Sequence, residues 1–191
     1  MSRRPLWGWI LEALETLAVT LIIFVGLQTF VAQPYRVQQE SMEATLEPGQ
    51  YVLVDKLTPR FDGYRRGDIV VFTPPADFPD AAGAPFIKRI VAVGGDRVEV
   101  KDGRLWVNGQ PLDEPYVYEG QPTEATGGES RWVVPPGDYF VLGDHRQASA
   151  DSRVFGPIPA SSIIGRAWLR YWPPPVFGIL PTPTYPALAG G

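Results

Sequence analysis

The strongest constraint on the fold of this 191-residue chain is an apolar run near its N-terminus, which carries no charged residue between Thr16 and Ala32. As a helix, this run covers roughly 26 Å at about 1.5 Å per residue, slightly less than the ~30 Å hydrocarbon core of a bilayer. The turn that carries Glu12 and Glu15 is therefore expected near the membrane interface, a level that aromatic side chains such as Trp7 favour. The sequence predicts one transmembrane helix here.

Two alternatives to a permanent anchor are a secretory signal that is cleaved off and a buried core helix. No A-x-A sequence lies just after the apolar run, where a cleavage site belongs, so we interpret residues 1–33 as a cytoplasmic N-terminus followed by an uncleaved anchor. Arg3 and Arg4 precede the run, and by the positive-inside rule they hold the N-terminus in the cytoplasm. Everything after Pro34 is then expected on the extracytoplasmic face. The absence of cysteine is compatible with that oxidising side.

From Tyr35 onward the apolar runs are short, rich in β-branched residues and bounded by glycine, proline or aspartate, which is typical of an all-β domain. These runs are YVLV at 51, DIVVF at 68, FIKRIVAV at 86, RVEV at 97, RLWV at 104, YFVL at 139 and IIGRAWLRYW at 163. We expect residues 34–175 to form a mostly β domain, in which about 98–138 are an inserted subregion with a hairpin turn at KDGR. Residues 176–191 are rich in proline and are expected to form an extended or disordered tail.

Composition excludes several classes of site. Without cysteine there is no disulfide, thiolate nucleophile, iron–sulfur ligation or cysteine-based zinc site. Because His145 is the single histidine, a histidine pair for a metal is impossible, and a serine hydrolase must use His145 or a different residue type as its base. The net charge is −4 and no run of lysine and arginine occurs, which argues against a nucleic-acid partner.

Among the three lysines, Lys88 is the strongest candidate for a general base. In FIKRIVAV the period of two places Phe86, Ile90 and Ala92 on the same strand face as this lysine, so apolar side chains flank its ammonium group. Burial there would lower the lysine pKa from about 10.4 by as much as ~3–5 units, toward the range of a base that acts at neutral pH. From the pattern alone, a lysine that reaches solvent from a strand edge remains an alternative.

Ser41, in RVQQESMEATLEPGQ, is the matching candidate for a nucleophile, because it follows a strand-like run and precedes a turn. A plain helix N-cap is the alternative role for a serine at this place. A third segment, GDHRQASADSRVFGPI, concentrates charged groups and hydroxyls just after an apolar strand, and its structural interpretation is a salt-bridged loop that closes the barrel. Its candidate residues are Asp144, Ser149, Asp151 and Arg153.

Together these segments resemble the bacterial type I signal peptidases, the membrane-bound serine/lysine proteases that remove signal peptides from exported proteins. SMEATL is similar to the nucleophile motif SMxPTL, GDIVVF to the next strand, FIKRIVAVGGD to the lysine motif, and GDHRQASADSR to GDNRxxSxDSR. The resemblance covers the anchor and most of the chain to about Trp172, in the family's order. It implies a mostly β catalytic core with an inserted β-hairpin subdomain and one N-terminal transmembrane helix.

The same resemblance implies that Ser41 is the nucleophile and Lys88 the general base, with no metal and no cofactor. Ser149 matches the serine that hydrogen-bonds and orients the lysine amine. The charged residues that match supporting positions are Asp144, Asp151 and Arg153. The residues that fall where the family binds small substrate side chains in shallow pockets are Tyr35, Val37, Met42, Leu46, Phe86 and Ile87.

Three positions depart from the motifs of the family. Ala44 stands at the usual proline of SMxPTL, which is expected to cost rigidity after Ser41 without removing a functional group. His145 stands at the usual asparagine, and a structural role is expected because one imidazole nitrogen can replace the amide as a donor. Gln39 stands where some members place a serine of the oxyanion hole, so the backbone N–H of Ser41 is the donor that the resemblance implies.

The implied activity is removal of N-terminal signal peptides from secretory preproteins after small residues, in the pattern A-x-A, at the outer face of the bacterial cytoplasmic membrane. The implied partners are these preproteins and the lipid bilayer. Two other interpretations are a membrane-anchored β-domain that binds an extracellular partner without chemistry, and a self-cleaving regulatory protease of the repressor type. A protease of the repressor type would have a DNA-binding helix pair at its N-terminus, where this chain has its apolar run.

Overall fold

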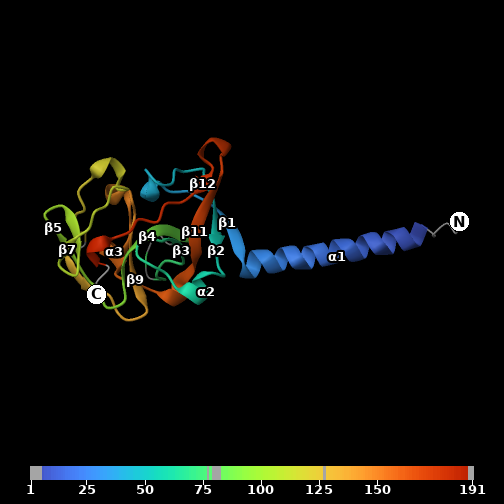
Figure 1. Cartoon of the computed structure of the whole chain (residues 1–191), viewed down its shortest axis with the longest axis horizontal. Helices are drawn as coiled ribbons and strands as arrows, with labels where there is room; N and C mark the ends of the chain where they lie inside the picture. Colours follow the sequence, from blue (N-terminus) through green and yellow to red (C-terminus); the bar gives the residue numbers. More distant parts are fainter. Residues whose placement is uncertain (1–5, 77, 79–82, 127, 189–191) are drawn as a thin grey trace.

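The computed structural model describes residues 6–76, 78, 83–126 and 128–188. A long helix, α1 (Leu6–Phe30), stands away from a body of β-strands (Figure 1). Its 25 residues span roughly 37 Å, and the segment Trp7–Phe30 has the length and composition of a membrane span without packing against the body. The predicted N-terminal helix is confirmed. Arg3 and Arg4, on which the predicted orientation depends, lie outside the described residues.

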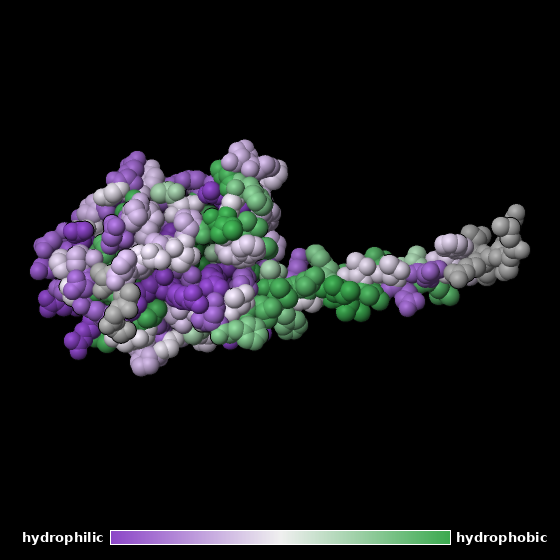
Figure 2. Space-filling view, in the orientation of Figure 1, coloured by the Kyte–Doolittle hydropathy of each residue, from purple (hydrophilic) through white to green (hydrophobic). Residues whose placement is uncertain are grey.

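The described side chains of α1 are apolar around most of the helix, so α1 has no polar face that would suit a soluble surface helix (Figure 2). Two of the threonine hydroxyls of α1 bond to carbonyl groups of the helix itself. Thr16 Oγ1 donates to the carbonyl of Glu12, and Thr20 Oγ1 to the carbonyl of Thr16, each at 2.8 Å. These bonds within the helix satisfy hydroxyls that hydrocarbon could not.

One residue, Val31, separates α1 from the first strand, β1 (Ala32–Arg36). Its N–H donates to the carbonyl of Leu27 in the helix at 2.9 Å, and its carbonyl accepts from the N–H of Lys56 in the body at 2.9 Å. Because both backbone groups of Val31 are bonded, the helix joins the body through a short ordered junction and not through a linker.

Within the described residues, the main sheet has eight antiparallel strands in the order β1-β2-β11-β3-β4-β9-β10, with β12 paired to β11. All seven predicted runs form strands, and the strands that were not predicted are β1 and the shorter β7, β8, β10 and β12. After β1, the strands of this sheet are β2 (Tyr51–Asp55), β3 (Ile69–Phe72), β4 (Phe86–Val93), β9 (Asp138–Leu142), β10 (Ile158–Pro159), β11 (Ile163–Trp172) and β12 (Gly178–Ile179). Short helices α2 (Pro59–Asp62) and α3 (Ser152–Phe155) lie between strands.

A second sheet of order β7-β6-β5-β8 is inserted between β4 and β9, which confirms the predicted hairpin insert in the fold. Its strands are β5 (Arg97–Lys101), β6 (Arg104–Val107), β7 (Gln110–Pro111) and β8 (Arg131–Val133). The β5–β6 hairpin turns at Asp102 and Gly103, whose φ angles of 52° and 72° are those of the tight turn predicted at KDGR. Inward side chains such as Leu105 share an apolar cluster with Phe140 of β9, so the two sheets have a common core.

The curl of the main sheet covers both faces of its central strands. All four residues of β3 are buried, with Val71 in one apolar cluster and Val70 in the cluster on the other face. A register irregularity between Ile90 and Ala92 interrupts β4. The prediction that Ala92 shares a face with Lys88 is therefore wrong in its last residue, because Ala92 packs in the cluster shared with the second sheet.

The chain after Trp172 returns to the body, so the predicted extended or disordered tail is wrong for residues 178–188. β12 pairs with β11, Leu180 is buried, and Tyr185 packs against the cluster between the sheets. Prolines do not prevent this arrangement, because side chains and carbonyl oxygens make most of the contacts, and neither needs the N–H that proline lacks.

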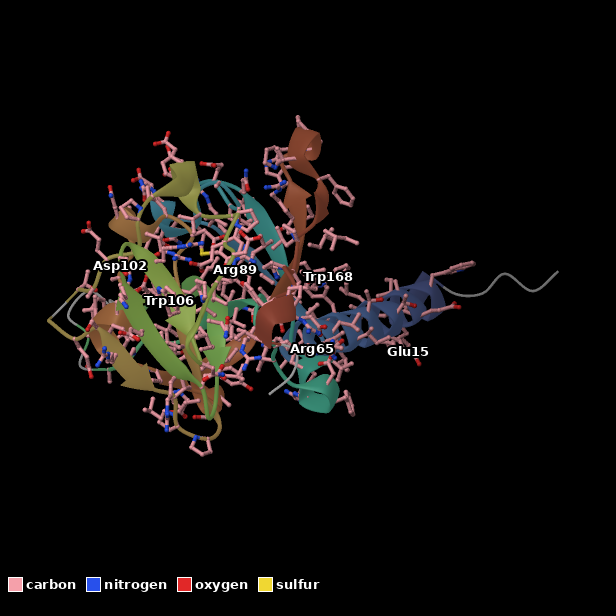
Figure 3. The ribbon with its side chains drawn as sticks, turned by 60° about the vertical axis from the view of Figure 1, so that its left-hand side comes forward. Glu15, Arg65, Arg89, Asp102, Trp106 and Trp168 are labelled. Carbon is pink, nitrogen blue, oxygen red and sulfur yellow. The ribbon has the colours of Figure 1, made fainter. Side chains whose placement is uncertain are left out.

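Large exposed apolar side chains occur on β11, on β12 and just before β12, and Figure 3 shows Trp168 on the side of the body near the base of α1. β2 alone separates β11 from β1, which continues from the helix. The residues are Trp168, Trp172, Phe177 and Ile179. An apolar surface of the body therefore lies next to the apolar helix.

Candidate active site

The ammonium nitrogen of Lys88 lies 2.7 Å from the hydroxyl oxygen of Ser41, although 47 positions separate the two residues in the chain. Both side chains are buried, with exposed fractions of 1% for Lys88 and 5% for Ser41. β4 carries the lysine from the centre of the sheet, and a 3₁₀ turn, Glu40–Met42, carries the serine. The structure therefore brings together the predicted nucleophile and the predicted base.

Burial lowers the pKa of Lys88 from 10.5 to about 8, because its ammonium loses hydration among apolar side chains. Phe86 and Ile90 lie two residues away on each side, and Val70 is its cross-strand partner on β3. The nearby charges of Asp151 and Asp144 raise the pKa and that of Arg153 lowers it, but desolvation is the largest effect. The alternative in which Lys88 reaches solvent is wrong.

Ser41 lies inside its 3₁₀ turn, at the centre of Glu40–Met42, so the alternative of a plain N-cap is also wrong. Gln39 occupies the cap position, with extended backbone and no capping bond from its side chain. The carbonyl of Ser41 accepts from the N–H of His145 at 3.1 Å. The turn is thus fastened by its backbone while the hydroxyl points to the lysine.

The turn continues through Ala44, whose φ of 77° lies in the left-handed region. A residue with a Cβ is strained there, at a cost of about 1–2 kcal/mol. Proline, with φ near −65°, cannot adopt this conformation. At Ala44 the backbone therefore follows a path that the usual proline of the motif could not take.

Asp144 and Arg89 form a fully buried ion pair next to this turn. Arg89 donates from Nε to Asp144 Oδ1 at 2.9 Å and from Nη2 to Oδ2 at 2.7 Å, and both side chains have 0% exposure. Thr45 Oγ1 donates to Asp144 Oδ2 at 2.6 Å. The Arg89–Asp144 pair holds Thr45, the residue after Ala44. It also neutralises the Asp144 carboxylate, one of the charges that act on Lys88.

Asp151 and Arg153 form a second buried two-pronged pair, with both charged bonds at 2.8 Å. Asp151 Oδ2 also accepts from the N–H of Gly143 at 3.1 Å and from the hydroxyl of Ser149 at 2.7 Å. Ser149 was expected to bond the lysine amine, but its hydroxyl is turned to this carboxylate in the structure. It still lies at the site, because a Cβ at Gly143 would clash with both the Ser149 hydroxyl and the Ser41 carbonyl.

A third buried pair, Arg146 with Glu114, was not predicted from the sequence. Arg146 donates to Glu114 Oε1 at 2.7 Å and to Oε2 at 3.0 Å, and its Nε donates to the carbonyl of Gly143 at 2.9 Å. Arg89 was missed in the same way. A signal was present for Arg89, since an arginine inside the apolar run FIKRIVAV needs a buried counter-ion.

His145 does not contact the nucleophile through its ring. Its Nδ1 lies 2.8 Å from Glu43 Oε2, and the imidazole stacks on Tyr118 with ring centroids 4.3 Å apart. Asp144, which could have held the ring as in a triad, instead binds Arg89 and Thr45. The ring of His145 therefore contacts Glu43 and Tyr118, and not Asp144 or the hydroxyl of Ser41.

A cleft of about 290 Å³, lined by both polar and apolar residues, opens at Ser41, between β1 and the start of β4. Of the six predicted substrate-binding residues, Tyr35, Val37, Met42 and Ile87 line it. Phe86 lines a neighbouring hollow that also contains Gln38 and Gln39. Leu46 is fully buried in the core and does not line the cleft.

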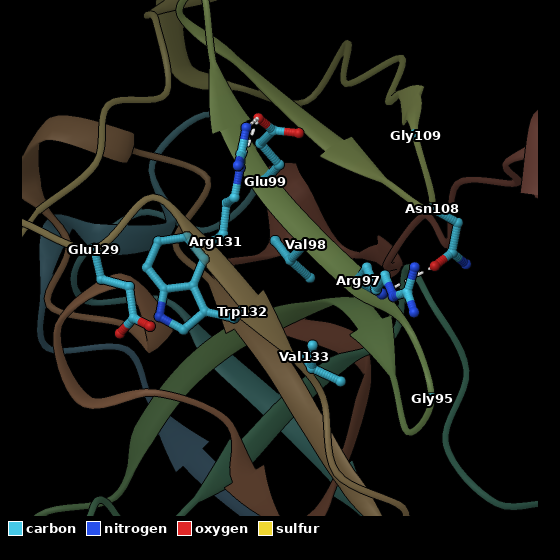
Figure 4. A pocket seen from close by; sticks show the side chains of 10 residues that line it. All are labelled: Gly95, Arg97, Val98, Glu99, Asn108, Gly109, Glu129, Arg131, Trp132 and Val133. Atoms are coloured by element: carbon cyan, nitrogen blue, oxygen red, sulfur yellow. Dashed lines mark hydrogen bonds and ion pairs between the residues drawn. The ribbon is translucent and has the colours of Figure 1, made fainter.

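A larger hollow lies on the outer face of the second sheet, away from Ser41 (Figure 4). Two of its charged side chains, Arg131 and Glu99, pair across strands at 2.8 Å. This arrangement is that of a solvated sheet face. Among the described residues, no group of three or more histidine, aspartate or glutamate side chains is placed to hold a metal ion.

Comparison with known proteins gives concordant results. Residues 10–172 match the family described as "Signal peptidase, peptidase S26". The chain is 38% identical over 180 residues to a "Signal peptidase I" of Leptolyngbya laminosa, with 92% of this chain and 87% of that protein covered. It is 36% identical over 178 residues to "Signal peptidase IB" of Staphylococcus aureus strain COL, with 86% and 90% covered.

A crystal structure of a signal peptidase I from Enterococcus faecalis V583 is also similar, at 32% identity and a TM-score of 0.43. The match covers 54% of this chain and 95% of that chain.

Proposed function

Because this chain belongs to the signal peptidase family, peptidase S26, we propose that it is a membrane-anchored serine endopeptidase that removes signal peptides from secretory preproteins, with Ser41 as nucleophile and Lys88 as general base. The observation that carries this proposal is the 2.7 Å contact between a buried amine and a buried hydroxyl. An amine with a lowered pKa is neutral in a useful fraction of molecules near neutral pH, and only the neutral amine can accept a proton.

The proposed reaction has two halves. Lys88 takes the hydroxyl proton while Ser41 Oγ bonds to the scissile carbonyl carbon, and the lysine then returns that proton to the leaving amine as the peptide bond breaks. An acyl-enzyme remains on Ser41. Lys88 next takes a proton from water, whose oxygen attacks the ester, and Ser41 regains its proton when the acid product leaves. No metal or cofactor takes part.

The proposed role of the charged neighbours is to keep the lysine balanced between its two states. Asp144 and Asp151 favour the ammonium that forms during attack, and without partners they would hold the proton permanently. Arg89 and Arg153 bind these carboxylates and weaken that effect. We therefore assign Asp144, Asp151 and Arg153 supporting roles, with Ser149 holding Asp151 in place.

We propose that the substrate binds as an extended strand in the cleft beside β1. The backbone of Val37 bonds inward, with its N–H on Gln50 and its carbonyl on Gly49, so the alternate residues Arg36 and Gln38 point their backbone groups the other way. An extended peptide could pair with that edge. In A-x-A the two small side chains project to the same face, which suits a small cleft whose lining includes Val37, Met42 and Ile87.

We further propose that α1 spans the bacterial cytoplasmic membrane once and that the β-body lies on the outer face. The apolar helix, the short junction at Val31 and the exposed apolar residues of β11 and β12 support a body held against the lipid surface. The substrate's own hydrophobic segment is held in the same membrane, so tethering raises the effective concentration of one for the other. The proposed partners are preproteins and lipid, with no nucleic acid.

The decisive experiment incubates the purified full chain with a preprotein that carries A-x-A at the end of its signal peptide, and identifies the products by mass spectrometry. Cleavage after the second small residue is expected. Ser41→Ala and Lys88→Ala should each abolish it, and Lys88→Arg should not restore it, because a guanidinium stays protonated. Full binding with no cleavage by the wild-type chain would favour a binding domain. Cleavage that survives Lys88→Arg would overturn the base assignment.

The membrane part of the proposal needs a separate measurement. A chain beginning at Gln33 lacks α1 but keeps every proposed catalytic group, so it should cleave short soluble peptides and lose efficiency on membrane-embedded preproteins. Equal efficiency on both substrates would contradict tethering. Protease added outside spheroplasts should digest the β-body. Protection of the body would show that it lies on the cytoplasmic side.

A further inference from the structure

The last described residues, 180–188, pack against the body next to residues that hold the candidate site, and we call this segment the strap. Leu180 is buried in the apolar cluster that contains Met42, and Pro183 lies so close to Gly67 that a Cβ there would clash with its carbonyl. Tyr185 and Leu188 pack on the cluster between the two sheets. The strap is thus seated on the body along its whole length, although the family match ends at residue 172.

The strap contacts the buried Arg89, which Figure 3 places inside the body. Arg89 Nη1 donates to the carbonyl of Gly67 at 2.9 Å and to the carbonyl of Pro181, in the strap, at 3.3 Å. The guanidinium lies over the ring of Tyr116 at 4.1 Å from its centroid. Pro181 and Tyr116 therefore supply part of the environment in which Arg89 holds Asp144.

A chain of hydrogen bonds connects the strap to the loop of the candidate site. Tyr185 and Tyr116 have their hydroxyl oxygens 2.7 Å apart, and Tyr116 donates to Glu114 Oε1 at 2.9 Å. Because that bond uses the Tyr116 proton, Tyr185 supplies the proton between the two tyrosines. Glu114 in turn binds Arg146, which holds the carbonyl of Gly143.

We propose that Tyr185 is a positioning residue for the proposed Ser/Lys reaction, which it serves by fixing Tyr116, whose ring packs on Arg89 and whose hydroxyl holds Glu114, the partner of Arg146. This inference rests on the proposed function and adds to it a part of the chain that carries no catalytic group. The Tyr185 hydroxyl acts through Tyr116 on Arg89 at one end and through Glu114 on Arg146 at the other. Arg89 binds Asp144 and Arg146 binds the carbonyl of Gly143, and both of these residues lie beside Ser41 and Lys88.

Loosening the strap is expected to raise the pKa of Lys88. The charged groups that act on the Lys88 amine are Asp151, Asp144 and Arg153. If Arg89 becomes hydrated and releases Asp144, that carboxylate acts on Lys88 without its counter-ion. The ammonium form is then favoured, so a higher pH is needed to obtain the neutral base.

The test compares Tyr185→Phe, Tyr116→Phe and the double variant in the full-length chain in detergent, with cleavage of a preprotein measured across pH. Both single variants remove the contact between the two hydroxyls, and Tyr116→Phe also removes the bond to Glu114. Tyr185→Phe should lower kcat/KM by about fivefold, with most of the loss in kcat and the acid limb moved up by about 0.5 pH unit, and Tyr116→Phe should lower kcat/KM at least as much. The double variant should be no worse than the worse single variant, because the two hydroxyls act as one unit. Tyr171→Phe, on β11, is the matched control and should leave both measurements unchanged.

A structural role alone would lower the melting temperature of Tyr185→Phe and leave the acid limb of the folded protein in place. That result, or additive losses in the double variant, would overturn the proposal. The failure of the proposed function gives a different pattern, since wild-type cleavage would then be absent or would persist in Lys88→Ala. Normal dependence on Ser41 and Lys88 with an unchanged Tyr185→Phe would reject the positioning role only.

Discussion

Lys88 and Arg89 are neighbours on β4, both are buried, and their cationic groups meet opposite kinds of partner. The amine of Lys88 lies against the hydroxyl of Ser41 at 2.7 Å, while Arg89 grips the carboxylate of Asp144 with two bonds. Alternation along a strand sends the two side chains to opposite faces. One strand thus supplies a cation whose charge is destabilised and, one residue later, a cation whose charge is fully paired.

The first prediction concerns the pH dependence of cleavage. Since the pKa of Lys88 is lowered to about 8 and only its neutral form accepts a proton, kcat/KM should rise about tenfold per pH unit up to a midpoint near pH 8 and then level off. The profile of the purified chain on a peptide substrate measures this, with circular dichroism at each pH as the control for folding. A midpoint below pH 6 in folded protein would assign the limb to a different group.

The second prediction is that Lys88→Met makes the protein more stable and inactive. The folded pKa of Lys88 lies below the unfolded value of 10.5, so the cost of burying the charge is fully present below pH 8 and disappears as pH rises from about 8 to 10.5. This cost is about 3 kcal/mol. Lys88→Met should raise the free energy of unfolding at pH 7 by about 1–3 kcal/mol, and the exposed Lys101→Met serves as control. A destabilised Lys88→Met would contradict the burial argument.

The third prediction concerns Gly143, where a Cβ would meet the Ser149 side chain and the Ser41 carbonyl. Gly143→Ala should displace the serine turn from Lys88 and lower kcat/KM by more than about a hundredfold, because small displacements of reacting groups are costly. Gly178→Ala is a matched control, since its Cβ would meet nothing within 4 Å. Near-normal activity of Gly143→Ala would show that the loop can move aside freely.

The fourth prediction uses the left-handed backbone of Ala44. Ala44→Gly should relieve strain and raise the free energy of unfolding by up to about 1 kcal/mol. Ala44→Pro should lower activity strongly, because proline cannot take a φ of 77°. Thermal melts should show the higher stability of Ala44→Gly, and kcat/KM should show the loss of activity of Ala44→Pro. An active and stable Ala44→Pro would mean that the turn adopts a different path.

The fifth prediction is that His145→Asn keeps activity within roughly tenfold, a loss of no more than about 1.4 kcal/mol in transition-state stabilisation. The contact to Ser41 comes from the backbone N–H of His145, which asparagine keeps, and the ring contacts Glu43 and Tyr118 instead. Glu43→Gln is the companion variant and should have an effect of similar size. A collapse of several orders of magnitude in folded His145→Asn would place the imidazole in the reaction.

Ser41 and Lys88 could be predicted because the motifs name them and because strand alternation already placed Lys88 among apolar residues. Their neighbours were harder to foresee. The pairing of Arg146 with Glu114 joins residues 32 positions apart, and local sequence does not reveal which carboxylate a buried arginine will meet. The tail was misjudged because proline content predicts where a sheet cannot continue, whereas Leu180 and Tyr185 are held by side-chain packing and hydroxyl bonding.

The bonded junction at Val31 fixes a height. Both backbone groups of Val31 are bonded, one to the helix and one to the body, and these bonds restrain the angle between helix and body. Under the proposed topology, the distance from the lipid surface to Ser41 is then built into the molecule, and the cleft meets every preprotein at the same level. The height of Ser41 above the membrane would then select the scissile bond, because only a substrate with the matching length of chain between its hydrophobic segment and that bond would place the bond at the site.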